Sequence, residues 1–303
     1  MHNQSIQVSN RHFSGVLHDN QANKQRSGSG FNPLTHIRYP EQNLFRDDAV
    51  GLNFEHIFNG AAKDADICMF TPRRDGCCVR RYSGSCASIV HDADNSSWNI
   101  DSEIRYTLPG EDSIDLEFRV TPREDRFPHG YLAFMWASYM NRTVDRRIYF
   151  LGRDNQYEGW IAFGQDTSDG FETGTIACHG VADLPYEDGT QTLNIIEHRR
   201  KKFVLPFYYG LVHGSGCVDN PDDRMVYIMM FDQKESIRFA MWNFITNAEG
   251  MPDAHSPAWD WQYVIQQPKI NQAYGYRARV VYKPFAGRDD VLSEYENWVR
   301  MIR

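Results

Sequence analysis

The sequence predicts an all-β protein, a large antiparallel β-sandwich with one C-terminal helix. Apolar and polar residues alternate with a period of two in several segments, and helical spacing occurs only at the end of the chain. Long apolar-aromatic segments also recur in the second half, at 225–231, 237–244 and 274–284. Such segments, separated by turn residues, are typical of large antiparallel sheets.

The elements follow in order along the chain. Residues 1–32 are polar, rich in Asn, Gln, Ser and Gly, and lack sustained periodicity, so they predict a flexible lead-in with order beginning near Pro33. Residues 99–108 and 113–121 both alternate around Pro109-Gly110-Glu111-Asp112, which predicts a β-hairpin. Residues 131–139 are almost continuously apolar, as in a strand buried on both faces. Further strands are expected at 77–82, 147–152, 158–163, 192–197 and 203–213.

The tail over 289–302 is the one segment with helical spacing. Its apolar residues fall at intervals of three and four, and Asp289-Asp290 suits the positive end of a helix dipole. No internal repeat or linker occurs within 33–303. We therefore expect a single β-sandwich domain that includes this helix.

Composition excludes several classes of function. The net charge of −8 lacks the basic footprint of a nucleic-acid-binding protein. No apolar run reaches the roughly 20 residues of a membrane span, and the first residues lack a secretory h-region, which predicts a cytoplasmic protein. No CxxC pair occurs, Cys77-Cys78 are adjacent, and no phosphate or dinucleotide motif is present, so neither a metal nor an organic cofactor is expected. One Ca²⁺ held by scattered carboxylates is the alternative.

The order of elements resembles the galactose mutarotase-like supersandwich over about residues 35–285. The local match is Asn53-Phe-Glu-His-Ile-Phe-Asn-Gly60, similar to the Asn…His-x-Tyr-Phe-Asn segment of aldose epimerases. His56, Phe58 and Asn59 take the corresponding places, although the run is one residue shorter here and lies earlier in the chain. The superfamily also contains sandwich domains of polysaccharide lyases and glycosidases. The resemblance implies a carbohydrate-active protein.

Acid–base work on a sugar needs a proton donor and a proton acceptor on either side of the ring. His213 is the first candidate, because it ends an aromatic strand before Gly214-Ser-Gly216 and precedes an acidic loop. His56 and His179 follow, the latter also before a glycine. Glu55 adjoins His56, but neighbours in a regular strand point to opposite faces, so only one of the two is expected in a given cleft. Each could instead be a structural residue.

Aromatic residues make up 14% of the chain, with 16 Tyr, 18 Phe and 7 Trp, which suggests a binding face in addition to a core. Sugar rings stack on such side chains while amides and carboxylates bind the hydroxyls. The candidate substrate-binding residues, grouped by position, are Tyr139 with Asn141, Trp242 with Asn243, and the exposed-looking cluster Trp259, Asp260 and Trp261. A buried role for the tryptophans is the alternative.

We therefore expect an enzyme of the epimerase or mutarotase kind, an isomerase, working on a sugar or uronate without a cofactor. The alternatives are a polysaccharide lyase or glycosidase with an open cleft, and a sugar-binding sandwich without catalysis. Histidines that converge on a carboxylate would favour an enzyme.

Overall fold

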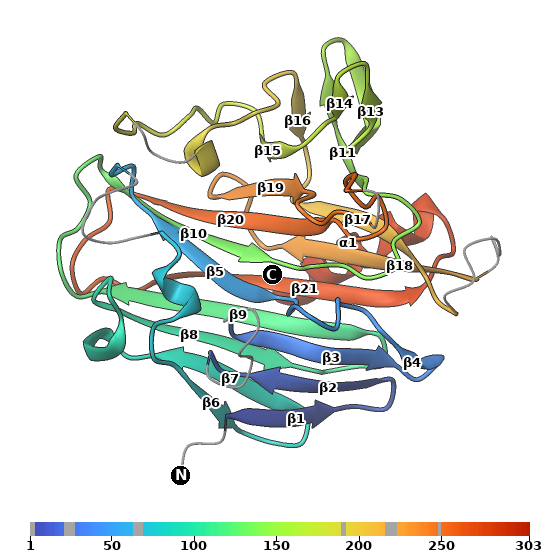
Figure 1. Ribbon diagram of the computed structural model, residues 1–303, viewed down its shortest axis with the longest axis horizontal. Helices are drawn as coiled ribbons and strands as arrows, with labels where there is room; N and C mark the ends of the chain where they lie inside the picture. Colours follow the sequence, from blue (N-terminus) through green and yellow to red (C-terminus); the bar gives the residue numbers. More distant parts are fainter. Residues whose placement is uncertain (1–3, 21–27, 63–68, 189–191, 216–222, 248–249) are drawn as a thin grey trace.

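The computed structural model describes residues 4–20, 28–62, 69–188, 192–215, 223–247 and 250–303. Antiparallel sheets are stacked in two layers, with one α-helix at the C-terminal end (Figure 1). The predicted fold class is confirmed. Among the described residues no helix has both the length and the apolar composition that crossing a membrane requires.

Ten strands form the long sheet of the first layer. Their order is β12 (Tyr157–Phe163), β11 (Ile148–Asp154), β17 (Phe207–His213), β18 (Arg224–Phe231), β21 (Tyr274–Pro284), β9 (Ser113–Pro122), β8 (Ile100–Thr107), β7 (Cys86–His91) and β6 (Cys78–Arg81), with β16 (Lys201–Phe203) beside β11. The predicted hairpin is confirmed, because β8 and β9 pair from Ile100–Pro122 to Thr107–Asp115. Buried residues alternate along both strands, as the period of two requires.

Two shorter sheets form the second layer and follow one another across the long sheet (Figure 1). The five-stranded sheet has the order β15 (Gly174–Ala177), β19 (Ile237–Trp242), β20 (Ala258–Gln266), β10 (Tyr131–Ala137) and β5 (Asn53–Phe58). The four-stranded sheet contains β1 (Ser5–Ser9), β2 (Phe13–His18), β3 (Gly30–His36) and β4 (Tyr39–Asn43). A two-stranded hairpin, β13 (Asp166–Thr167) and β14 (Gly170–Phe171), lies apart from them.

The main core lies between the two layers and includes Trp136, Trp261, Phe118 and Tyr276. The helix α1 (Arg288–Ile302) confirms the predicted tail. It packs Val291, Tyr295 and Trp298 on the opposite side of the long sheet, against residues such as Phe207.

The prediction of a flexible lead-in over 1–32 is wrong for the part that the structure describes. Strands β1 and β2 bury Ile6, Val8, Phe13 and Leu17 in the main core. The alternation in these strands is short and set among polar residues, so composition concealed it. Strands β1 and β2 are therefore ordered well before Pro33.

Smaller differences concern short elements. Residues 192–197 were expected to form a strand, but the 3-10 helix η3 (Thr192–Asn194) lies there instead. The segment 203–213 divides between β16 and β17. Two further 3-10 helices are η1 (Thr71–Arg73) and η2 (Ala93–Asn95).

Candidate functional site

A β-bulge in β5 brings Glu55 and His56 to one face of the five-stranded sheet. His56 pairs with Met135, but the next pair joins Phe54 to Trp136, so Glu55 is an extra residue without an opposite partner. Bulges redirect side chains in this way and are common beside active sites. Phe54 and Ile57 face the core, whereas Glu55 and His56 both contact Arg73. The expectation that only one of them could face a given cleft is therefore wrong.

Four side chains from three segments meet in direct contact on this outer face. The Arg73 guanidinium pairs through Nη2 with the Glu55 carboxylate. The same nitrogen lies 3.4 Å from His56 Nε2 and 3.5 Å from the Tyr139 hydroxyl. Tyr139 donates a hydrogen bond to Glu55. We call Glu55, His56, Arg73 and Tyr139, together with the nearby Asp260, the polar cluster.

The contact with Arg73 assigns the tautomer of His56. A guanidinium can only donate, so His56 Nε2 accepts and the ring proton is on Nδ1, which lies 3.6 Å from the second Glu55 oxygen. Burial, and then the positive charge of Arg73, hold the pKa of His56 well below its ordinary value. His56 is therefore a neutral imidazole near pH 7.

Asp260 lies close enough to Glu55 and Arg73 for their charges to affect its pKa. It lies on β20, is 2% exposed, and accepts the Ser138 backbone N–H at 3.3 Å. Burial, and then the charge of Glu55, raise the pKa of Asp260 well above its ordinary value. Burial and Glu55 likewise raise the pKa of Tyr139. The cluster thus contains a carboxylate held by Arg73 and a second carboxyl group that favours its neutral form.

The raised pKa of Asp260 predicts a pH-dependent cost to stability. The folded state holds this proton more tightly than the unfolded chain, whose Asp pKa is about 3.9, so stability falls as pH rises above that value. Asp260→Asn removes this titration and retains an oxygen for Ser138. We expect the variant to unfold at higher urea concentration than the parent at pH 8, with the difference shrinking towards pH 4. A lower urea midpoint at pH 8 would contradict this account.

Arg73 and Phe70 are site residues that sequence reasoning missed. The 3-10 helix η1 turns Arg73 inward across the Phe70 ring, with the guanidinium carbon 4.7 Å from the ring centroid. The His56 ring meets the same Phe70 edge-on at 4.6 Å. The available signal was Pro72, because proline in the first turn of a helix favours a local turn that can redirect the next side chain.

Two predicted binding residues lie in the core instead. Trp259 and Trp261 are 0% exposed, and Trp261 stacks on Trp136 with ring centroids 5.6 Å apart. The expectation of an exposed Trp259-Asp260-Trp261 cluster is wrong, because alternation along β20 sends both rings inward and Asp260 outward. Trp242 remains beside the cluster, packed against a group of residues that includes Tyr139.

The remaining predicted residues lie apart from these contacts. His213 ends β17 in the long sheet, opposite Arg224, and its backbone N–H binds Arg142. His179 is exposed in the turn after β15. The amides of Asn141 and Asn243 bind the backbone oxygens of Asn43 and Asp253. The roles predicted for these four residues stay predictions.

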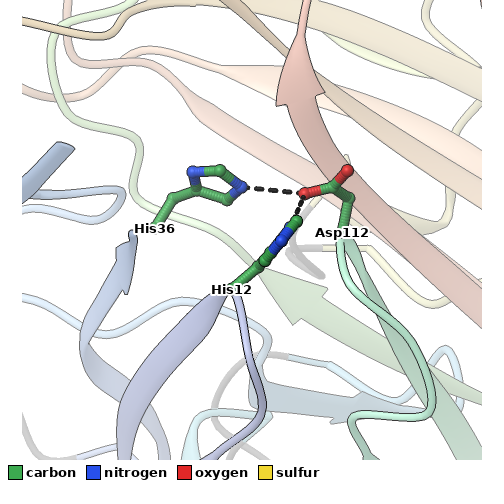
Figure 2. A group of neighbouring side chains, drawn as sticks. All are labelled: His12, His36 and Asp112. Carbon is green, nitrogen blue, oxygen red and sulfur yellow. Dashed lines mark hydrogen bonds and ion pairs between the residues drawn. The ribbon is translucent and has the colours of Figure 1, made fainter. Parts of the chain in front are cut away.

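A group with metal-ligand chemistry lies elsewhere, where the four-stranded sheet meets the β8–β9 turn (Figure 2). His12 Nδ1 and His36 Nε2 lie 2.8 and 2.9 Å from the same oxygen of Asp112. His36 Nδ1 accepts the Arg38 backbone N–H at 3.1 Å, so the ring proton is on Nε2 and points at Asp112. A metal-binding histidine presents a lone pair there and donates from its other nitrogen. The group is therefore better described as a hydrogen-bonded clamp between the layers.

Comparisons with known proteins locate the fold. No family model and no curated protein matches the chain. A candidate aldose 1-epimerase of Escherichia coli K12 superposes with a TM-score of 0.50 at 11% identity, over 93% of this chain and 99% of its own. A TPR-domain containing protein of Parabacteroides distasonis reaches 0.49 at 7% identity, over 94% of this chain and 48% of its own. A GalM/aldose epimerase homologue of C. elegans superposes with a TM-score of 0.45 at 11% identity, over 92% of this chain and 98% of its own.

At such low identity a structural likeness establishes the fold and not the activity. The likeness to the Escherichia coli protein covers almost the whole of both chains. The resemblance to the galactose mutarotase-like supersandwich is therefore confirmed for the fold alone, and no particular family is assigned.

Proposed function

We propose that the chain is a sugar-active enzyme of the aldose epimerase or mutarotase kind, and that the polar cluster is its active site. The observation that carries the proposal is the bulge at Glu55, which joins a carboxylate, an imidazole, a guanidinium, a phenol and a raised-pKa carboxyl group on one face. Burying five polar groups together costs free energy of folding. Such a cluster, with perturbed pKa values, is therefore typical of a functional site. The fold shared with the Escherichia coli protein supports a sugar as substrate.

Interconversion of anomers requires the anomeric hydroxyl to lose a proton and the ring oxygen to gain one. A base takes the proton of the anomeric hydroxyl, the bond between C1 and the ring oxygen breaks, and an acid protonates that oxygen. The open aldehyde rotates and the ring closes by the reverse transfers. Each transfer contributes typically 10²–10⁴-fold when a positioned side chain performs it.

The two carboxyl groups suit these roles because their surroundings differ. Glu55 faces the Arg73 guanidinium and acts as the base. Asp260 is buried and raised in pKa, so it keeps a proton to donate to the ring oxygen. Tyr139 orients the Glu55 carboxylate through its hydrogen bond, and neutral His56 accepts from Arg73 and holds that guanidinium in place.

Arg73 favours a second candidate function. Its side chain is 30% exposed while Nη2 is engaged with Glu55, so part of the side chain remains open to solvent. An arginine in this place could pair with the carboxylate of a uronate. A lyase acting on a uronate linked through C4 would use the same base to remove the C5 proton next to that carboxylate, while the C4–O bond breaks and an acid protonates the leaving oxygen.

A panel of neutral aldoses and of oligosaccharides that contain uronates distinguishes the two functions, with NMR exchange spectroscopy for the first and ultraviolet absorbance for the second. The proposal expects faster exchange between α and β anomeric signals of at least one aldose than in buffer alone. A lyase would instead produce an unsaturated uronate, detected by its ultraviolet absorbance. If the protein changes neither signal with any sugar of the panel, the catalytic proposal fails and a binding protein remains.

A further inference from the structure

A pair of stacked aromatic rings, one half-buried and one exposed, adjoins the polar cluster. Trp242 ends β19, and the Phe244 ring lies parallel to it, with centroids 5.7 Å apart and an interplanar angle of 11°. Phe244 is 72% exposed, so the ring face away from Trp242 meets solvent. The sequence placed Phe244 at the end of a predicted strand and attached no function to it.

The register of the sheet relates this pair to the proposed active site. Trp242 pairs with Ala258 on β20, and Ala258 in turn forms a bridge with Tyr139. Two strand spacings, or about 10 Å, therefore separate the backbones of Trp242 and Tyr139. Trp242 fills the interval, because its side chain packs on the group that contains Ala258 and Tyr139.

This spacing exceeds the reach of a single pyranose held by Glu55 and Tyr139. A second ring joined to the first could lie towards Phe244, with its C–H face on the phenyl ring. The Trp242 indole N–H is buried and has no hydrogen-bond acceptor in the described part of the chain. Buried donors of this kind are usually satisfied by a water or a ligand, and a hydroxyl bound at this junction would provide the acceptor.

We propose that Phe244, supported by Trp242, is a subsite for a second sugar ring, so that the preferred substrate is a reducing oligosaccharide and not a monosaccharide. The inference rests on the proposed function for the identity of the first subsite. The reducing ring lies at the polar cluster, where its anomeric centre meets Glu55. The next ring lies on Phe244 and contributes binding without taking part in the proton transfers.

Matched mono- and disaccharides test the subsite: glucose against maltose, cellobiose and lactose, each of which has glucose as its reducing ring. Binding is measured by NMR titration of the protein, and turnover by anomer exchange of the reducing ring. At least one disaccharide is expected to bind more tightly than the monosaccharide that shares its reducing ring. Phe244→Ala is expected to lower that disaccharide affinity roughly tenfold, the order that aromatic stacking provides. Monosaccharide affinity and exchange should be unchanged.

Tyr157→Ala is the control, since it also removes an exposed aromatic ring, 59% exposed on the edge strand β12. It should leave both affinities unchanged. The subsite is refuted if no disaccharide of the panel binds more tightly than its monosaccharide. It is also refuted if the Phe244→Ala variant keeps the higher affinity for the disaccharide. Disaccharide binding that depends on Phe244, without any anomer exchange, would support the subsite while rejecting the catalytic proposal. Anomer exchange with equal affinity for mono- and disaccharides would support the catalytic proposal and reject the subsite.

Discussion

Replacing Glu55 by Gln is expected to lower the rate of anomer exchange by roughly 10²–10⁴, because the amide cannot accept the anomeric proton. Gln keeps the volume of Glu and still accepts hydrogen bonds from Tyr139 and Arg73, so the fold should persist. Turnover is followed by exchange spectroscopy on the best aldose of the panel. Circular dichroism and the melting temperature report on the fold.

The chain contains a matched control for this variant. Glu103 accepts the Tyr82 hydroxyl at 2.7 Å and Arg105 at 3.1 Å, so it also sits between a phenol and a guanidinium, but on β8 of the long sheet. Glu103→Gln should leave exchange unchanged. Equal losses in the two variants, or full activity in Glu55→Gln, would remove Glu55 from the mechanism.

A comparison of two histidines decides between the site predicted from sequence and the site assembled in the structure. Loss of turnover in His213→Gln, with His56→Gln active, would return the site to the end of β17. The opposite result would support the polar cluster.

Replacing Trp261 by Ala is expected to destabilise the fold by about 3–5 kcal/mol, the range for deleting a buried aromatic side chain. The ring is fully buried, stacks on Trp136, and donates its indole N–H to Tyr276 at 2.7 Å. The variant would leave a cavity between the layers and an unpaired hydroxyl. Urea unfolding, followed by fluorescence and by circular dichroism, measures the change in free energy.

The comparison variant is Phe244→Ala, which removes an aromatic ring from the surface and should change stability by less than about 0.5 kcal/mol. A loss below about 1 kcal/mol in Trp261→Ala would mean that the ring is not packed as described. Weakened sugar binding with unchanged stability would restore the binding role first predicted for Trp261.

Elements with long, regular alternation could be predicted from the sequence. The hairpin of β8 and β9 and the helix α1 each follow from a period that one segment displays by itself, and the buried strand β10 follows from an unbroken apolar run. Short strands such as β1 and β2 could not be predicted, because five or six residues with two or three apolar members resemble a polar loop. Their stability comes from Ile6 and Phe13 packing in a core that distant segments build.

The residues of the candidate site could be predicted from the sequence, but their arrangement could not. Glu55, His56, Tyr139 and Asp260 were all identified as chemically suitable from their residue types and local positions, since carboxyl, imidazole and phenol groups near strand ends are visible in any sequence. Their convergence was not predictable, nor was the inward turn of Arg73, because contacts between β5, η1 and β20 depend on pairings across the sheet.

The sequence by itself determined the all-β class, the C-terminal helix and a supply of acid–base groups, since these follow from local periodicity and side-chain chemistry. Only the tertiary structure decided which groups share a face. A one-residue change of register reverses every following side chain, and the bulge at Glu55 makes such a change in β5. Alternation in β20 then sends Trp259 and Trp261 into the core and leaves Asp260 near Glu55 and Arg73. The register between strands sets these positions, and it depends on how the whole sheet packs.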